Sequence, residues 1–263
     1  MKLNLVDFLD FVIQDVKRTI KEGYYDVQFN ERRLQRSLKD SIVKCKKIPV
    51  IAEIKPASPK DGVLKKEMNA REMAIAIERG GAVGISVLTE PKRFKGSLEI
   101  LSIVRKTVDI PILMKDFIIS PVQIDAADKI GADAILLIKS IFDLEFSERN
   151  LKEMIEIAKS RGIEVLLEVH NEDEFLSSLQ TEADMIGINN RDLTTLNVDL
   201  EVTKRILSKI ENRERIIVSE SGITTPADVK TLHNFGTHAF LIGTAIMTAN
   251  DVEAKVREFV EAI

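Results

Sequence analysis

Eight short apolar segments recur along this chain, and segments with helical spacing separate them. They start at intervals of about 20 to 33 residues, the size of a βα unit. Each apolar run lacks a polar face, which is typical of parallel strands covered by helices on one side and packed inside on the other. The predicted strands are Pro49–Ile54, Val83–Leu88, Pro111–Met114, Ala134–Ile138, Glu164–Leu167, Met185–Ile188, Arg215–Val218 and Ala239–Ile242. The predicted helices include Ala70–Arg79, Ser97–Lys106, Leu151–Arg161, Leu200–Ile210 and Pro226–Phe235. An α/β fold with a parallel sheet follows from this pattern.

The junctions between helix and strand repeat as well. Gly80-Gly81, Gly131 and Gly236 each precede an alanine-containing strand, and glycine there can adopt the left-handed conformation that ends a helix. One unit repeated around one ring favours a closed (β/α)8 TIM barrel. The length of 263 residues agrees with a barrel of about 250 residues. Periodicity alone leaves an open, doubly wound eight-stranded sheet as the alternative.

Residues 1–48 are predicted to form an N-terminal helical extension that caps the barrel, and residues 49–263 the barrel itself, as a single domain overall. Apolar residues at helical spacing mark the first helix of the extension, and a second is expected between Leu34 and Val43. The first set is Leu5, Phe8, Leu9, Val12, Val16 and Ile20. We expect a cap over one barrel end; a lid over the active-site mouth is the alternative.

Composition excludes several classes of protein. The formal net charge of -4 gives no reason to expect nucleic acid or an anionic membrane as a partner. Cys45 is the only cysteine, so disulfides within the chain and cysteine-built metal sites are ruled out. No segment approaches the roughly 18 apolar residues of a membrane span, and the N-terminus lacks a signal-peptide cleavage pattern. We expect a cytoplasmic protein.

Ionisable and amide side chains stand where the predicted strands end. In a TIM barrel the active site lies at the carboxyl ends of the strands. The candidates are Glu53 and Lys55, Lys115 and Asp116, Glu168 and His170, Asn189 and Arg191, Glu220 and Ser221, and Gly243 and Thr244. Among them, three glutamates and three cations gathered at one mouth could pair with each other: Glu53, Glu168 and Glu220 with Lys55, Lys115 and Arg191. Such a cluster provides a cationic acid and a carboxylate base within one cavity.

Two turns suit a phosphate group. Ser221-Gly222 and Gly243-Thr244 follow the last two strands, where many barrels bind phosphate through backbone N–H groups. The residues by themselves therefore indicate an enzyme that acts on a small phosphorylated anion by acid–base chemistry. No convincing metal-ligand cluster is visible in the sequence.

Seven motifs, in register from about Val50 to the C-terminus, resemble those of the indole-3-glycerol-phosphate synthase family. They are Ile51–Pro59, Ser86–Glu90 with Phe94–Ser97, Leu113–Phe117, Leu167–His170, Gly187–Leu193, Glu220–Ile223 and Leu241–Thr244. Each motif is moderately specific, and their order makes the set highly specific. The family converts 1-(2-carboxyphenylamino)-1-deoxyribulose 5-phosphate into indole-3-glycerol phosphate, carbon dioxide and water in tryptophan biosynthesis.

The resemblance implies a role for each matched residue. Lys115 is the general acid at the ribulose carbonyl, and Glu168 transfers protons in decarboxylation and dehydration with Lys55. Glu53 and Asn189 position Lys115 and the substrate hydroxyls. The substrate-binding residues are Ser58, Phe94, Phe117, Arg191, Glu220 and Ser221, with the two phenylalanines walling the aromatic ring. The phosphate-binding residues are Lys55, Gly222, Gly243 and Thr244. The resemblance implies no metal or organic cofactor; we expect a monomer, and association with other enzymes of the tryptophan pathway stays open.

Several positions depart from the family pattern. Pro56 stands where many relatives carry a basic residue, Arg93 where an aromatic residue is common, and Thr244 where serine is commoner. We expect His170 to lie at the mouth without acting as a base. His233 and His238 receive no role.

Two other hypotheses about the function of the chain stay open. The nearest is another phosphate-binding barrel, such as a phosphoribosylanthranilate isomerase or an aldolase that forms a Schiff base through Lys115. A Schiff-base lysine favours a depressed pKa, whereas carboxylates around Lys115 would keep it protonated. A non-catalytic barrel that binds a metabolite or a partner is the other reading, although mere binding would not need this acid–base set.

Overall fold

The protein forms a closed parallel barrel. The structure is a computed structural model that describes residues 5–28, 36–58, 62–64, 68–193, 195–209 and 215–263. The barrel strands are β1 (Val50–Ile54), β4 (Gly84–Leu88), β5 (Ile112–Lys115), β6 (Ala134–Ile138), β7 (Glu164–Val169), β8 (Met185–Asn189), β9 (Ile216–Glu220) and β10 (Ala239–Ile242). β1 pairs in parallel with both β4 and β10, which closes the ring. The predicted TIM barrel is confirmed, and the open sheet is wrong.

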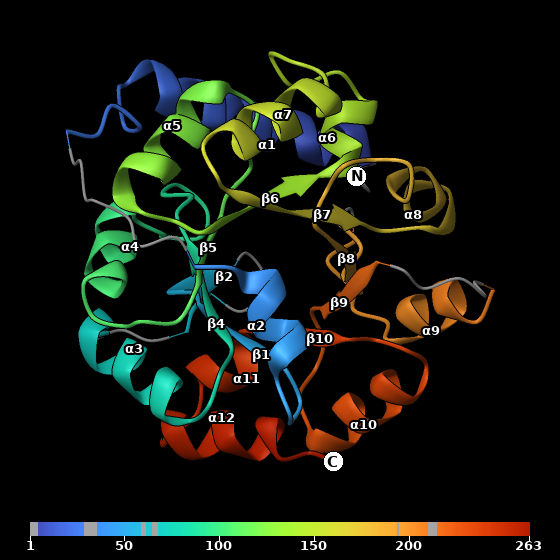
Figure 1. Cartoon of the computed structure of the whole chain (residues 1–263). Helices are drawn as coiled ribbons and strands as arrows, with labels where there is room; N and C mark the ends of the chain where they lie inside the picture. The colour runs from blue at the N-terminus through green and yellow to red at the C-terminus, as the bar shows by residue number, and fades with distance from the viewer. Residues whose placement is uncertain (1–4, 29–35, 59–61, 65–67, 194, 210–214) are drawn as a thin grey trace.

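Helices form an outer ring around the strands (Figure 1). They are α3 (Ala70–Arg79), α4 (Leu98–Arg105), α5 (Pro121–Ile130), α7 (Leu151–Ser160), α8 (Glu172–Ser178), α9 (Glu201–Leu207), α10 (Pro226–Asn234) and α12 (Val252–Val260). Two short helices directly follow strands, α6 (Lys139–Asp143) after β6 and α11 (Thr244–Met247) after β10. A small hairpin, β2 (Ala57–Ser58) and β3 (Gly62–Val63), follows β1. The predicted strand ends differ from the observed ones by at most two residues.

Glycine ends helices where the sequence predicts it. Gly81, Gly131 and Gly236 have φ angles of 91°, 90° and 99°, a region that residues with a Cβ adopt at a cost. Gly80 differs, since it is right-handed with φ -67°. A Cβ at Gly80 would lie 2.6 Å from Cβ of Val256, so this glycine allows α3 and α12 to pack closely.

Helix α2 (Leu38–Lys44) covers the amino-terminal end of the barrel, and Figure 1 shows it in front of the barrel centre. The backbone N–H groups of Leu38 and Lys39 donate to the carboxylate of Glu164, the first residue of β7, at 2.8 and 3.0 Å. Leu38 and Ile42 are buried in the same apolar cluster as the barrel-interior residue Ile51. α2 therefore closes the end of the barrel opposite the candidate site.

Helix α1 (Leu5–Lys21) and the turn after it reach the carboxyl end of the strands. The phenol of Tyr25 donates to Asp116, directly after β5, at 2.9 Å, and the phenol of Tyr24 donates to the carbonyl of Thr89, directly after β4, at 2.9 Å. Asp15 of α1 forms an ion pair with Arg93 at 2.7 Å. The two helices before β1 thus contact opposite ends of the barrel.

The buried face of α1 consists largely of the predicted stripe. Leu9, Val12 and Val16 are buried, together with Ile13, in a cluster that also contains Phe117, and Phe94 packs against this cluster. The side chain of Leu5 lies outside the described residues. α1 therefore supports apolar residues near the barrel mouth.

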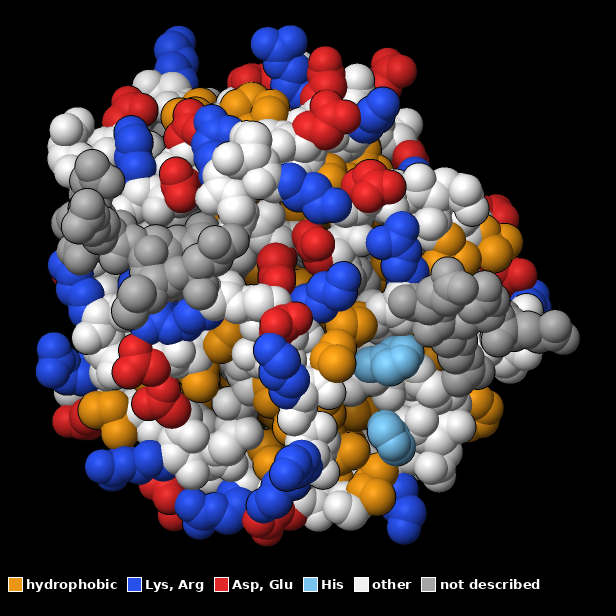
Figure 2. Space-filling view, viewed as in Figure 1, with side chains coloured by type: hydrophobic (Ala, Val, Ile, Leu, Met, Phe, Trp, Pro, Cys, Tyr) orange, Lys and Arg blue, Asp and Glu red, His pale blue; other side chains and the backbone are white. Residues whose placement is uncertain are grey.

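The surface carries charges of both signs. On the face drawn in Figure 2, basic and acidic side chains are interspersed around the molecule and do not gather by sign. Within the part of the chain that the structure describes, no helix is long and apolar enough to cross a membrane.

Candidate active site

A cavity of about 340 Å³ opens at the carboxyl ends of the barrel strands. That volume lies in the range of pockets for small ligands. The predicted site residues that line it are Glu53, Lys55, Phe94, Lys115, Phe117, Glu168, Asn189, Arg191, Ser221, Gly222, Gly243 and Thr244. Glu220 lies beneath the lining and contacts Lys115. The side chain of Ser58 lies outside the described residues, so its role stays a prediction.

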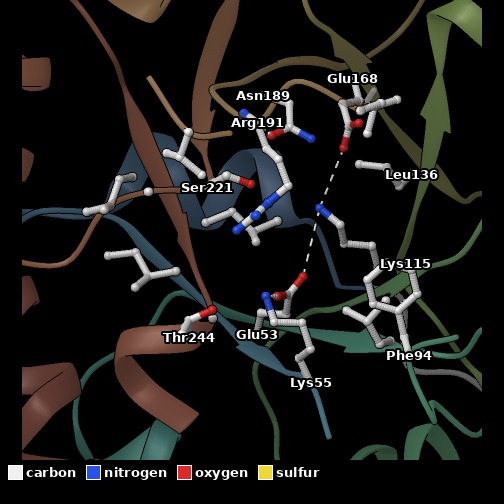
Figure 3. A pocket seen from close by; sticks show the side chains of 18 of the residues that line it. Glu53, Lys55, Phe94, Lys115, Leu136, Glu168, Asn189, Arg191, Ser221 and Thr244 are labelled. Atoms are coloured by element: carbon white, nitrogen blue, oxygen red, sulfur yellow. Dashed lines mark hydrogen bonds and ion pairs between the residues drawn. The ribbon is translucent and has the colours of Figure 1, made fainter. Parts of the chain in front are cut away.

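The ammonium group of Lys115, at the end of β5, stands at the centre of the site. Its Nζ atom lies 2.6 Å from Oε2 of Glu220, 3.6 Å from Oε2 of Glu168 and 3.8 Å from Oε1 of Glu53. Figure 3 shows the Lys115 ammonium between the carboxylates of Glu168 and Glu53. Three strands far apart in sequence therefore direct carboxylates at one cation.

This surrounding decides the protonation of Lys115. Burial by itself disfavours the charged form, but the carboxylates of Glu220, Glu168 and Glu53 outweigh burial and raise the pKa of Lys115 far above its ordinary value. Lys115 is therefore a cation throughout the physiological pH range. It can donate a proton or a hydrogen bond, and it is not a free amine nucleophile.

Two of the carboxylates are driven in opposite directions. Burial raises the pKa of Glu220, and although Lys115 opposes this, the carboxylate of Glu168 adds to the increase. Burial also acts on Glu168, but there the charges of Lys115 and then His170 outweigh it and lower the pKa. The site therefore holds Glu168 ionised, while Glu220 takes up a proton more readily. Two carboxyl groups in unlike environments are a common arrangement for acid–base catalysis.

Glu53 and Lys55 form a second ion pair at the end of β1. Lys55 Nζ lies 3.0 Å from Glu53 Oε2, as expected for residues two apart on one face of a strand. Burial raises the pKa of Glu53, but Lys55 and Lys115 outweigh it, and the net shift is downward. A Cβ at Gly243 would lie 2.3 Å from Oε2 of Glu53, so glycine at the end of β10 makes room for this carboxylate.

Asn189 and Arg191 follow β8. The side-chain oxygen of Asn189 accepts a hydrogen bond from the backbone N–H of Arg191 at 3.0 Å, and the Arg191 guanidinium donates to the carbonyl of Leu196 at 3.0 Å. Behind them, the buried side chain of Asn190 hydrogen-bonds to Thr203 and Ser219. These bonds fix the segment that carries Asn189 and Arg191 into the pocket.

One side of the pocket is apolar. The rings of Phe94 and Phe117 have centroids 6.0 Å apart, and Leu136, Ile138 and Leu193 also line the cavity. Figure 3 shows Phe94 and Leu136 on the same side of the pocket as Lys115. This wall can take a flat apolar group.

The opposite side is polar and built on tight turns. Figure 3 places Ser221 and Thr244 there. Ser221 and Gly222 both have positive φ angles, 67° and 79°, and a Cβ at Gly222 would lie 2.1 Å from the Val198 side chain. Only glycine therefore fits at position 222 with this backbone.

A few lining residues were not predicted from the sequence. Leu136 and Ile138 belong to β6, which contributes only apolar side chains to the lining. Leu193 and Val198 come from the segment after β8. The predicted number of strands could have indicated the role of β6, because every strand of an eight-stranded ring ends at the mouth. An apolar strand end facing a pocket is the natural place for an apolar part of a ligand.

Comparison with known proteins identifies the family. Residues 10–259 match the family model of indole-3-glycerol phosphate synthase. The chain belongs to this family. A family member from Methanocaldococcus jannaschii is 42% identical over 254 residues, covering 95% of this chain and 91% of the relative. Another from Caldanaerobacter subterraneus subsp. tengcongensis is 39% identical over 260 residues, covering 98% of each.

More distant barrels share only the fold. Thiamine phosphate pyrophosphorylase from Pyrococcus furiosus superposes with a TM-score of 0.61 at 18% identity, covering 86% of this chain and 97% of that one. N-acetylmannosamine-6-phosphate 2-epimerase from Clostridium perfringens superposes with a TM-score of 0.58 at 15% identity, covering 82% and 93%.

Two positions that depart from the indole-3-glycerol phosphate synthase pattern, Arg93 and Pro56, make contacts in the structure. Arg93 does not extend the aromatic wall, since it forms the ion pair with Asp15 of α1, while Phe94 and Phe117 still form that wall. The carbonyl of Pro56 accepts a hydrogen bond from the N–H of Leu64 at 2.9 Å, beside the β2–β3 hairpin.

Among the described residues, no group of three or more His, Cys, Asp or Glu side chains is arranged to hold a metal ion.

Proposed function

We propose that the pocket catalyses the indole-3-glycerol-phosphate synthase reaction, with Lys115 as general acid and Glu168 as the proton-transferring carboxylate. The observation that carries this assignment is the buried Lys115 ammonium among three carboxylates, between an apolar wall and a polar side of the same cavity. The substrate, 1-(2-carboxyphenylamino)-1-deoxyribulose 5-phosphate, has an aromatic end, a ketone in the middle and a phosphate end, in the same order.

The two sides of the pocket suit the two ends of the substrate. The carboxyphenyl ring would pack on Phe94, Phe117 and Leu136, since flat apolar groups are stabilised by burial against aromatic and aliphatic side chains. The phosphate would lie at Gly222, Gly243 and Thr244, with Lys55 supplying a positive charge. With the substrate held at both ends, its ring carbon and its ketone carbon would be in contact, which favours ring closure.

Ring closure is the first step. The aromatic carbon that bears the carboxylate attacks the ketone carbon of the ribulose chain, and a carbon–carbon bond forms. Lys115 donates a proton to the ketone oxygen, which becomes a hydroxyl. The acid acts where negative charge develops, so its effect is greatest in the transition state. Glu53 and Asn189 would hold Lys115 and the substrate hydroxyls.

Decarboxylation and dehydration complete the reaction. The bond from the ring carbon to the carboxylate breaks, carbon dioxide leaves, and the electron pair restores the aromatic ring. The new hydroxyl then leaves as water after protonation, while a proton is lost as the indole double bond forms. Glu168, ionised beside Lys115, would accept and pass on these protons, assisted by Lys55. Ser221 would line the sugar part of the substrate, while Glu220, beneath the lining, would act only through its contact with Lys115. Arg191 would orient the polar segment around Asn189.

The protonation of Lys115 weighs against the rival aldolase. A Schiff base requires a neutral amine, whereas the raised pKa of Lys115 keeps it charged. Borohydride treatment in the presence of a ketose phosphate tests this: we expect no covalent adduct, and an adduct at Lys115 would favour the aldolase.

The direct test is the reaction itself. Purified protein is incubated with the carboxyphenylamino substrate, and indole fluorescence is followed over time, with carbon dioxide release measured in parallel. We expect both products at equal rates. Loss of substrate without indole fluorescence, or no turnover at all, would contradict the proposed function.

We further propose that the enzyme is a monomer in the cytoplasm. The barrel strands of a single chain close into one ring that carries the pocket at its carboxyl end, and a phosphorylated sugar derivative is an intracellular metabolite. Light scattering on the purified protein should give a mass near 29.5 kDa. A mass at a multiple of this value would contradict the monomer.

A further inference from the structure

His170 lies directly behind the catalytic carboxylate. It follows β7, two residues after Glu168, and its side chain is only 14% exposed. The pocket lining includes Glu168 but, among the described residues, not His170. The imidazole is therefore placed to act on Glu168 and not on a bound substrate.

Two carboxylates flank the imidazole. Its Nε2 atom lies 3.2 Å from Oε1 of Glu168, and its Nδ1 atom lies 3.5 Å from Oε2 of Glu174 on α8. Neither contact has the alignment of a hydrogen bond, so the interaction between these groups is an ion pair. Glu168 uses its other oxygen, Oε2, toward Lys115 at 3.6 Å. Glu168 thus has a cation on each side.

Glu174 is itself held in place. Its carboxylate accepts hydrogen bonds from the backbone N–H of His170 and from the side chain of Asn171, both at 2.8 Å. Asn171 in turn caps the first turn of α8 through the N–H of Glu174 at 2.9 Å. The outer carboxylate therefore belongs to the rigid beginning of a helix.

The charges around His170 favour its protonated form. Burial by itself lowers the pKa of an imidazole, but Glu168 and Glu174 outweigh burial and raise the pKa of His170 to about 9. The nearest other cation, Lys115, lies on the far side of Glu168. Glu172, another acidic residue of α8, forms an ion pair with Lys209. At neutral pH His170 is a cation between two anions.

We propose that His170 is a positioning residue for Glu168: paired with Glu174, it holds the Glu168 carboxylate ionised and directed at Lys115. This inference rests on the proposed role of Glu168 in proton transfer. A histidine that acted as the base itself would need access to the substrate and an unprotonated ring. His170 has neither, because it lies behind the pocket lining and is held as a cation.

The pairing can be measured without turnover. The chain has three histidines, so proton NMR resolves each imidazole during a pH titration of the parent protein. We expect one imidazole to titrate near 9, and its pKa to fall by about one unit or more in Glu168→Gln and in Glu174→Gln. His170→Asn identifies the signal. An ordinary titration near about 6.5 in the parent protein would overturn the pairing.

The role in catalysis is tested by the pH dependence of kcat/KM. Without the imidazolium, the pKa of Glu168 rises, so the acid limb of the profile of His170→Asn should move up by about one pH unit. We expect kcat to fall by about tenfold, less than for loss of a general acid or base, with KM within about threefold of the parent. His233→Asn is the matched control, since His233 lies exposed on α10, and it should change neither quantity.

The outcomes separate this inference from the proposed function. If His170→Asn does not fold, Glu174→Gln tests the same pair with His170 intact. Because the pKa of His170 should fall in this variant, the alkaline limb of its kcat/KM profile should move to lower pH. An unchanged acid limb in folded His170→Asn would overturn the positioning role. If the parent makes no indole product, the proposed function fails, while the NMR titrations still decide whether the pairing exists.

Discussion

Lys115 is a buried cation that faces more negative than positive charge. Three carboxylates lie within 3.8 Å of its ammonium, and Lys55 partly offsets them through Glu53. Burying charge is costly unless opposite charges are close and well oriented. The sign and position of each residue in this group therefore affect both the protonation of the site and its chemistry.

Replacing Lys115 by alanine should reduce kcat by about 10² to 10⁴, because a general acid acts chiefly in the transition state. KM should change much less. Steady-state kinetics on Lys115→Ala measures both, and circular dichroism checks the fold. Lys92→Ala serves as the control, since Lys92 pairs with Glu22 at the surface. Activity within a few-fold of the parent would remove Lys115 from the mechanism.

Asp116 should make stability depend on pH. Burial raises the pKa of Asp116 to about 6, although hydrogen bonds from Thr89 and Tyr25 oppose the increase. Since the folded pKa lies above the unfolded one, Asp116 favours folding at low pH, and this contribution is lost as pH rises through about 6. The shift corresponds to a change of roughly 3 kcal/mol in the free energy of unfolding.

The comparison for Asp116 is urea unfolding of the parent and Asp116→Asn near pH 4.5 and near pH 7.5. The amide cannot ionise, so the stability of the variant relative to the parent should improve toward the higher pH. A relative stability that does not change with pH would show that Asp116 titrates like an exposed carboxyl group.

Among the elements, helix α1 and the two turns proposed to bind the phosphate lie on different parts of the site. α1 packs with the aromatic wall and is tied to the segment after β4 by the Arg93–Asp15 pair. The turns after β9 and β10 carry Gly222 and Thr244 on the other side of the pocket. Each element can be tested for its own part of the binding energy.

Deleting residues 1–29 should leave a folded barrel with a lower kcat and a raised KM. The deletion removes Leu9, Val12 and Val16 from the apolar cluster that contains Phe117, together with the Tyr25 bond to Asp116. Circular dichroism and kinetics on the truncated protein measure both effects. Native-like folding with unchanged kcat and KM would leave α1 a purely structural cap.

Thr244→Ala should raise KM with little effect on kcat, since a phosphate contact is made in both the ground state and the transition state. Inorganic phosphate should compete with the substrate in the parent and compete less well in the variant. Thr231→Ala is the control, because Thr231 is exposed on α10, away from the pocket lining. If phosphate does not inhibit the parent at all, the assigned anion site is wrong.

The whole molecule divides stability and chemistry between the two ends of the barrel. α2 closes the amino-terminal end, where Leu38 packs so closely that a Cβ at Gly84 would lie 2.7 Å from it. The candidate site lies at the carboxyl end. This division is general for barrels of this type, in which the amino-terminal face contributes to stability.

Leu38→Ala should therefore lower stability without altering catalysis. Removing a fully buried leucine costs about 2 to 5 kcal/mol, and Leu38 is fully buried. Urea unfolding should show that loss, while kcat and KM at a temperature where the variant is folded stay at the parent values. A changed KM in the folded variant would mean that the two ends of the barrel are coupled.

Local structure and the composition of the site could be predicted from the residues alone. Strand bounds, the left-handed glycines at Gly131 and Gly236, and the charged residues at strand ends follow from periodicity and from backbone conformation. Both are properties of neighbouring residues. The family also followed from the sequence, because seven motifs kept their order.

Which residues meet across the barrel depends on how the whole chain folds. Closing the ring places Lys115 against Glu220, 105 positions away, and leaves the apolar end of β6 as part of the pocket wall. It also separates α1 and α2 to opposite ends, and it sets His170 between Glu168 and Glu174. These contacts depend on the strand register and helix packing of the whole chain, which short-range patterns do not contain.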